Sequence, residues 1–200
     1  MEQTAFVFPG QGSQFPGMGK TLADNFECAR RVFEEADDAL GFKISQLCFE
    51  GPEDALKLTE NTQPALVTVS TAAFAVLKEK GMTPAYVAGH SLGEYSALVA
   101  AGSLAFADAV RIVRNRGRYM QDAVPAGVGA MAALLKLPED KLEGILAEAA
   151  QGEVVSAANH NSPDQVVIAG NAGAVNRAAE LAKAAGAKRA VLLPVSAPFH

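Results

Sequence analysis

The first part of the chain alternates between short apolar runs and longer stretches in which apolar residues recur at helical spacing. The run Ala5–Phe8 ends at Pro9, which is typical of a buried strand that leads into a loop. A second short strand is predicted over 86–88. Helices are predicted over 22–40, just after Pro52, and over 62–80, 93–101 and 105–123. Strands that alternate with helices predict a mostly parallel sheet.

From Gly127 onward the pattern changes to the order β-α-β-β-α-β. The predicted elements are a strand over 130–137, a helix over 138–150, strands over 154–159 and 165–170, a helix that ends at 185, and a strand over 190–195. This order is the split βαβ, ferredoxin-like pattern. We therefore predict a small subdomain over 127–195, inserted into a larger α/β subdomain formed by 1–126 and 196–200.

Composition and charge exclude some classes of function. The 200 residues are half apolar and carry a net charge of −5, which is ordinary for a globular protein and gives no support to nucleic-acid binding. The two cysteines form no CxxC pair or His/Cys cluster, so no metal site is predicted and a reducing compartment fits. The N-terminus has no basic region and no long apolar run. We therefore expect a soluble, cytoplasmic protein without a membrane span.

The segment Gly89-His-Ser-Leu-Gly93 stands between a predicted strand and a predicted helix, which is the context of a nucleophile elbow. A serine on such a turn has a strained backbone, and glycines two residues to either side avoid a collision. The turn would expose the Ser91 hydroxyl at a helix N-terminus, where N–H groups favour the negative charge of a tetrahedral intermediate. The plainer alternative is a Gly-Ser turn without chemistry.

A serine nucleophile needs a base, and the chain has three histidines. His90 adjoins the serine on a tight turn, where neighbouring side chains rarely face each other, so a structural hydrogen bond suits it better. His160 falls in a predicted strand of the small subdomain. His200 follows the last predicted strand in a loop that leads back toward the larger subdomain, and this position favours His200 as the base.

On the helix predicted over 105–123, Arg116 is a charged residue that projects from the apolar side. Arg111, Arg114 and Arg118 share one side, as on a solvated basic face. Arg116 falls roughly 140° from Arg111, among apolar residues. An inward guanidinium needs an anionic or strongly polar partner, either a carboxylate of the protein or one that arrives with the substrate. Beside an acylatable serine, the second alternative predicts a dicarboxylic, malonyl-like acyl group.

The loop after the first strand reads Phe8-Pro-Gly-Gln-Gly-Ser-Gln14. Phe15 stands where a dinucleotide-binding fingerprint needs glycine, so this cofactor is not predicted. In elbow enzymes the oxyanion hole combines the N–H after the nucleophile with an N–H from another strand–helix loop. Leu92 and Gln11 suit those two positions. The alternative is a loop that only turns the chain.

Five segments of the chain together resemble the malonyl-CoA:acyl-carrier-protein transacylases. They are Phe8–Gln14, Thr62-Gln-Pro-Ala65, Gly89-His-Ser-Leu-Gly-Glu-Tyr-Ser96, Asn115-Arg-Gly117 and Pro198-Phe-His200. Their combination spans the whole chain and is far more specific than any single motif. Members of this family usually continue well past the histidine, so the resemblance implies that the chain is C-terminally shortened.

The resemblance implies an α/β-hydrolase-like large subdomain and a set of site residues. Ser91 and His200 would form a catalytic dyad, and Arg116 would bind the malonyl carboxylate. The N–H groups of Gln11 and Leu92 would form the oxyanion hole. Three further residues would line the cleft: Gln63, Asn159 and Asn161.

The implied activity is ping-pong transfer of malonyl from malonyl-CoA to acyl carrier protein in fatty acid synthesis. We expect a monomer that needs no metal and no bound cofactor. An acidic carrier protein would need a local basic patch, because the chain is itself acidic. Two alternatives remain open: a serine esterase or thioesterase that shares the elbow, and a non-catalytic module that binds carrier protein.

Overall fold

The computed structural model describes residues 4–125, 127–193 and 199–200. The chain divides into two compact units, Met1–Tyr119 and Met120–His200. The first unit contains β1 (Ala5–Phe8), α1 (Lys20–Asn25), α2 (Glu27–Leu40), α3 (Ile44–Glu50), α4 (Glu53–Lys57), α5 (Thr59–Glu79), β2 (Tyr86–Gly89), α6 (Gly93–Ala100) and most of α7 (Phe106–Asp122).

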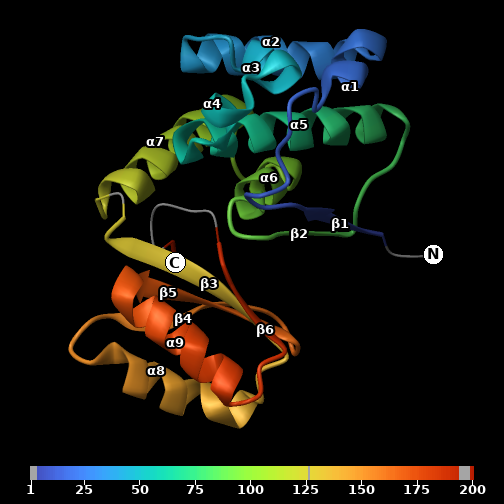
Figure 1. Cartoon of the computed structure of the whole chain (residues 1–200). Helices are drawn as coiled ribbons and strands as arrows, with labels where there is room; N and C mark the ends of the chain where they lie inside the picture. The colour runs from blue at the N-terminus through green and yellow to red at the C-terminus, as the bar shows by residue number, and fades with distance from the viewer. Residues whose placement is uncertain (1–3, 126, 194–198) are drawn as a thin grey trace. The chain divides into compact units, whose positions relative to one another are not determined.

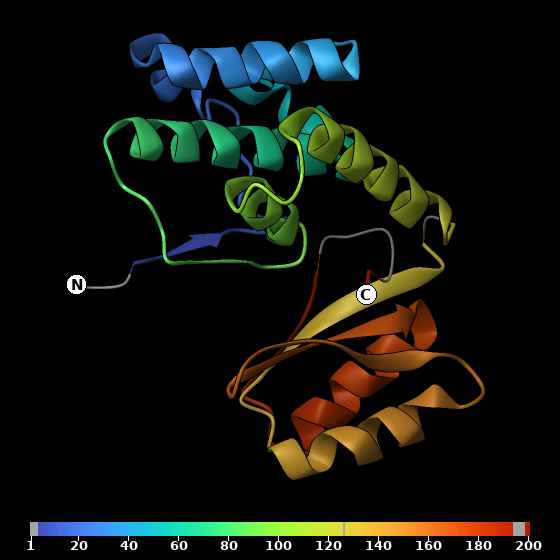
Figure 2. The ribbon, with the colours of Figure 1, turned by 180° about the vertical axis from the view of Figure 1, so that it is seen from behind.

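The first unit stacks its helices on a parallel pair of strands. Strand β1 pairs with β2 from Ala5 opposite Tyr86 to Phe8 opposite Gly89. Helix α6 packs on both strands, α5 packs on α6, and α2 runs alongside α5 (Figures 1 and 2). Because α5 lies between two other helices, it is buried along most of its length, Pro64 in its second turn included. The largest fully buried apolar side chains of this core are Ile44, Leu56, Val67, Leu92, Val110 and Val113.

The helix predicted over 22–40 is interrupted, which corrects the prediction of one continuous helix. Phe26 is extended, with φ −130° and ψ 120°, and separates α1 from α2. The apolar spacing continues across the break because both helices pack against the same core, so the spacing did not reveal it. Helix α3 was not predicted, although its buried residues Ile44 and Cys48 stand four positions apart.

The second unit is an antiparallel sheet with helices on one face. Its elements are β3 (Gly129–Leu135), a 3₁₀ turn (Glu139–Lys141), α8 (Leu142–Ala150), β4 (Val155–Ser162), β5 (Gln165–Asn171), α9 (Ala172–Ala184) and β6 (Arg189–Leu192). The strand order is β4-β5-β3-β6. Helices α8 and α9 lie on one face of this sheet (Figure 1). Along β3 the side chains alternate, with Ala132 and Leu134 in the cluster that includes residues of α8 and α9, and Met131 and Ala133 on the other face.

The mixed α/β class and the β-α-β-β-α-β order of the second half were predicted correctly. Where a mostly parallel sheet was predicted, the described residues form a small parallel sheet of β1 and β2. Several boundaries differ. Strand β3 ends at Leu135 rather than at 137, and the predicted strand over 190–195 is observed as Arg189–Leu192, with 194–195 outside the described residues. Strand β4 runs on to Ser162, and the connection to β5 shortens to a turn of two residues. The pairing of β4 with β5 shifts between Ala157 and Asn159 and again between His160 and Ser162. These irregularities interrupt the alternation that a pattern of period two relies on.

No helix in the described part of the chain is long and apolar enough to cross a membrane. The same residues contain no group of three or more His, Cys, Asp or Glu side chains placed to hold a metal ion.

Cys28 and Cys48 are both free thiols. Burial, reinforced by the nearby charge of Asp37, raises the pKa of the Cys48 thiol to about 12. Cys48 is therefore a packing residue rather than a nucleophile.

Two glycines inside helices predict opposite effects of adding a methyl group. A Cβ on Gly117 of α7 would lie 2.6 Å from Glu60 Cα and 2.7 Å from Thr59 O, both backbone atoms of α5. We expect Gly117→Ala to lower the free energy of unfolding by about 1–3 kcal/mol through overpacking. At Gly144 of α8, no atom lies within 4 Å of the added carbon. Gly144→Ala should therefore raise the free energy of unfolding by about 0.5–1 kcal/mol. Urea unfolding of both variants checks this, and a stabilising Gly117→Ala would contradict the tight α5–α7 contact.

Candidate active site

Ser91 lies on a sharp turn between β2 and α6, and its backbone is strained. Its φ is +52°, in the left-handed region that a residue with a Cβ rarely adopts. The flanking glycines make the turn possible. A Cβ on Gly89 would lie 1.9 Å from the Gly93 carbonyl carbon, and one on Gly93 would lie 2.3 Å from Phe8 O. The backbone of β1 thus presses against the start of α6, and only glycine fits at either position.

The loop after β1 lies against this turn. A Cβ on Gly10 would lie 2.6 Å from His90 O and 2.7 Å from His90 Nδ1, so the next residue, Gln11, is beside the elbow. The Gln11 side chain donates from Nε2 to Thr59 Oγ1 at 3.1 Å. Leu92, whose side chain is fully buried, precedes the first residue of α6. Its N–H therefore belongs to the group that a helix leaves without an intrahelical acceptor.

The Arg116 guanidinium reaches the same turn from α7. It donates from Nη1 to Gln63 Oε1 at 2.8 Å and from Nη2 to Ser91 Oγ at 3.4 Å. Its Cζ lies 5.8 Å from the centroid of the Tyr95 ring. Among the described residues, no carboxylate lies within ion-pair distance of Arg116. Its side chain is half-buried, so a partly desolvated positive charge stands beside the serine hydroxyl, with no counter-ion in the part of the chain that the structure describes.

The other three arginines of α7 each have a carboxylate partner. Arg111 pairs with Asp108, and both Arg114 and Arg118 pair with Glu60. Arg114 does not lie on a solvated face, which corrects the prediction from the helical projection. Its side chain is only 18% exposed, its Cζ stands 4.4 Å from the centroid of the Phe42 ring, and burial lowers the pKa of its guanidinium. Arg114 is therefore both packed on a ring and paired with a carboxylate, whereas Arg116 has no carboxylate partner within the described ranges.

The remaining predicted site residues belong to the second unit. Asn159 and Asn161 lie on β4, and Asn161 donates from Nδ2 to Gln165 Oε1 at 3.1 Å. Asn159 is opposite Val167, on the sheet face away from α8 and α9, whereas the next residue, His160, is opposite Val166 on the helix-covered face. The two asparagines are thus presented by the irregular part of β4.

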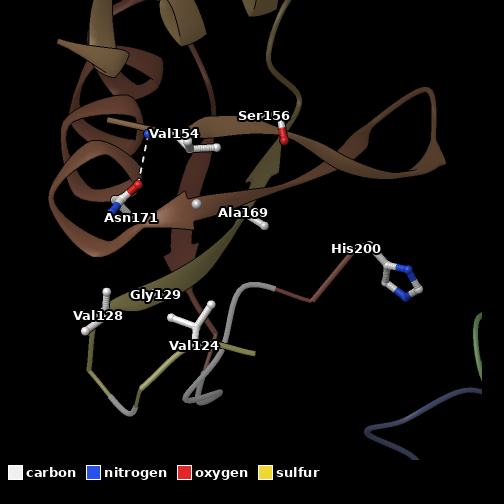
Figure 3. Close-up of a pocket in the computed structure, with 9 residues that line it drawn as sticks. Val124, Val128, Gly129, Val154, Ser156, Ala169, Asn171 and His200 are labelled. Carbon is white, nitrogen blue, oxygen red and sulfur yellow. Dashed lines mark hydrogen bonds between the residues drawn. The ribbon is translucent and has the colours of Figure 1, made fainter. Parts of the chain in front are cut away.

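The histidines of the second unit line different cavities. His160 borders one of about 250 Å³. His200 borders another of about 360 Å³, whose walls are mainly apolar. Figure 3 shows the valines and Ala169 around this second space, with Asn171 held by its hydrogen bond from Val154 N at 2.9 Å, and the His200 ring off to one side of them. The valines are Val124, Val128 and Val154, and the cavity is also lined by Gly129, Ser156 and Gly170.

The structure brings Gln63, Ser91 and Arg116 together within hydrogen-bonding distance, with Leu92 in the turn. The pairing of Ser91 with His200 stays a prediction. Tyr95 was missed from the sequence, although it stands four positions after the serine, on the first turn of the helix that the serine precedes. A serine hydroxyl at a helix start, beside loop N–H groups and a guanidinium that has no carboxylate partner among the described residues, could act as a nucleophile that transfers an anionic acyl group.

Comparison with known proteins gives one consistent result. The model of the acyl transferase domain family matches residues 5–200. The chain is 55% identical to the malonyl CoA-acyl carrier protein transacylase of Bacillus subtilis (strain 168), over 100% of this chain and 63% of the relative. It is 54% identical to the protein of that name from Escherichia coli (strain K12), over 100% of this chain and 65% of the relative. The chain therefore spans somewhat less than two thirds of the length of these relatives.

Solved structures agree with the sequence matches. A crystal structure of an acyl carrier protein S-malonyltransferase from Vibrio cholerae O1 biovar eltor str. N16961 matches with a TM-score of 0.95 at 51% identity, over 98% of this chain and 65% of that one. PlMCAT, a malonyl-transacylase solved in complex with AntF, a type II PKS acyl-carrier protein, matches with a TM-score of 0.95 at 50% identity, over 98% and 65% of the two chains.

Proposed function

Because the chain belongs to the acyl transferase domain family, we propose that it transfers a malonyl group from malonyl-CoA to the phosphopantetheine thiol of acyl carrier protein. The transfer proceeds through a malonyl ester on Ser91 and serves fatty acid synthesis. The relatives named malonyl CoA-acyl carrier protein transacylase, which cover the full chain at 54–55% identity, support this substrate pair. The complex of PlMCAT with its carrier protein supports the class of partner.

One observation carries the choice of acyl group: the guanidinium of Arg116 stands 3.4 Å from Ser91 Oγ, with no carboxylate partner among the described residues. An acyl group on Oγ can form an ion pair with this guanidinium only if the acyl group carries its own carboxylate. The carboxylate must also lie close to the ester carbonyl, because the two side chains are in contact. A malonyl group, with one methylene between the two carbonyl carbons, meets both requirements and gives a charge-assisted pair.

The proposed cycle uses only protein groups. His200 accepts the Ser91 hydroxyl proton while Oγ attacks the thioester carbonyl carbon. The N–H groups of Gln11 and Leu92 stabilise the oxyanion. The carbon–sulfur bond then breaks, and coenzyme A leaves as the thiol with the proton from the imidazolium. The carrier-protein thiol gives its proton to His200 and attacks the malonyl ester, and Ser91 regains its proton as it leaves.

The roles of the second unit are part of the same proposal. Asn159 and Asn161 line the cleft beside the thioester, together with Gln63. Residues 127–195 form a ferredoxin-like subdomain, which the strand order β4-β5-β3-β6 supports. Residues 1–126 and 196–200 belong to an α/β-hydrolase-like subdomain, which the parallel pair and the elbow support. We expect a monomer in the cytoplasm that requires neither metal nor bound cofactor.

The test is incubation of the complete polypeptide that contains these residues with malonyl-CoA and holo-acyl carrier protein. Intact-mass spectrometry should detect malonyl on the carrier protein, and peptide mapping after brief exposure to malonyl-CoA alone should locate a malonyl adduct on Ser91. Free malonate without loaded carrier protein would identify a hydrolase instead. Carrier-protein binding without any adduct would identify a non-catalytic module.

A further inference from the structure

The aromatic ring of Tyr95 stands beside the Arg116 charge. Tyr95 lies in the first turn of α6, where its N–H donates to Leu92 O at 3.0 Å. Its side chain is half-buried and packs against the core of the first unit. The ring centroid is 5.8 Å from Arg116 Cζ, within the range of a cation–π interaction. The position of the ring is therefore fixed by the helix that also holds the nucleophile turn.

The guanidinium of Arg116 is held by groups that do not neutralise it. Gln63 offers a neutral amide oxygen to Nη1 at 2.8 Å, and Tyr95 offers the negative face of its ring. A carboxylate at either position would form an ion pair and compete with a substrate carboxylate. Arg114 shows the other arrangement, since it has both an aromatic ring, Phe42, and a carboxylate, Glu60.

We propose that Tyr95 positions the guanidinium of Arg116 and keeps its charge available, and so increases the preference for an acyl group that bears a carboxylate. This inference rests on the proposed function. Tyr95 is a positioning residue, because it acts through Arg116 rather than on the reacting atoms. The ring supplies the attraction, so the phenol hydroxyl is not required.

The test measures kcat and KM for malonyl-CoA, and acylation by acetyl-CoA, in the complete polypeptide. Tyr95→Leu should raise KM for malonyl-CoA and lower the malonyl-to-acetyl preference, each by about three- to tenfold, with kcat nearly unchanged. Tyr95→Phe keeps the ring and should restore wild-type values. Tyr95→Met is a second non-aromatic variant whose flexible side chain refills the site if leucine packs poorly. Both non-aromatic variants should give the same shift.

Two controls separate positioning from a general loss of structure. Tyr119→Leu, at a 71% exposed position on the same helix as Arg116, should leave the preference unchanged. In an Arg116→Ala background, Tyr95→Leu should cause no further loss of preference, because its partner is gone. Equal losses with malonyl and acetyl groups, or additive effects of the two substitutions, would overturn the inference while leaving the proposed function intact. If the wild-type protein forms no malonyl adduct on Ser91, both this inference and the proposed function are rejected.

Discussion

Ser91→Ala should abolish the malonyl adduct and lower malonyl transfer by at least about a thousandfold, the order expected when a nucleophile is removed and only binding remains. The strained backbone of Ser91, at φ +52°, places its Oγ just before the start of α6, and alanine keeps the turn while deleting the proposed reacting atom. The measurements are intact-mass spectrometry after exposure to malonyl-CoA and a carrier-protein loading assay. The free energy of unfolding should stay the same or rise.

The matched control for this prediction is Ser96→Ala. Ser96 belongs to the same helix, is only 2% exposed, and its Oγ has no hydrogen-bond partner in the described structure. Removal of an unsatisfied hydroxyl leaves no stranded partner, so activity and stability should change little. An adduct of the same mass in Ser91→Ala, located on any other residue, would reject Ser91 as the acylated group.

The local features of the site could be predicted from the sequence because they depend on neighbouring residues. The glycines at 89 and 93, a strand before and a helix after are sufficient to indicate an elbow. The structure adds why substitution is impossible there, since a Cβ on Gly93 would lie 2.3 Å from a carbonyl oxygen of β1. The resemblance to malonyl-CoA:acyl-carrier-protein transacylases that the five motifs indicated is confirmed by the family match and by the relatives.

The partners of Arg116 could not be predicted, because they come from distant parts of the chain. The helical projection correctly showed that Arg116 points away from Arg111, but not what it meets. Gln63 is 53 residues away and arrives through the packing of α5 against α7. The same projection placed Arg114 on a solvated face, because it contains no information on Phe42 or Glu60. Helical periodicity gives a direction, and only the tertiary packing decides whether a charge is paired.

The predicted helix boundaries were wrong for a related reason. The break at Phe26 between α1 and α2 leaves the apolar spacing intact, since both helices cover one core. In the second unit the order of elements was predicted correctly, but the irregular pairing of β4 was not. That irregularity sets which of the neighbouring residues Asn159 and His160 lies on the sheet face away from α8 and α9. A shift of one residue in a strand cannot be read from composition.

Arg116→Ala should reverse the choice of acyl group. Loss of the guanidinium removes the proposed charge-assisted partner of the malonyl carboxylate, so kcat/KM for malonyl-CoA should fall about a hundredfold or more. The rate of acylation by acetyl-CoA should stay the same or increase. In the wild-type site the methyl group of an acetyl ester would offer no counter-ion to the charge of Arg116 beside Ser91. The ratio of malonyl to acetyl adduct on Ser91, measured by mass spectrometry in a mixture of the two thioesters, checks this.

Arg111→Ala is the control, because it removes an equal charge from the same helix. Arg111 is exposed and bonds to Ala39 O and Asp108, so its loss should change neither rate nor preference by more than about twofold. If net charge alone attracted the anionic substrate, the two variants would weaken malonyl transfer equally and salt would reproduce the effect. A contact at 3.4 Å between Arg116 Nη2 and Ser91 Oγ instead requires a difference confined to Arg116. An unchanged preference in Arg116→Ala would mean that another group holds the carboxylate, and the choice of a malonyl group would then rest on the relatives alone.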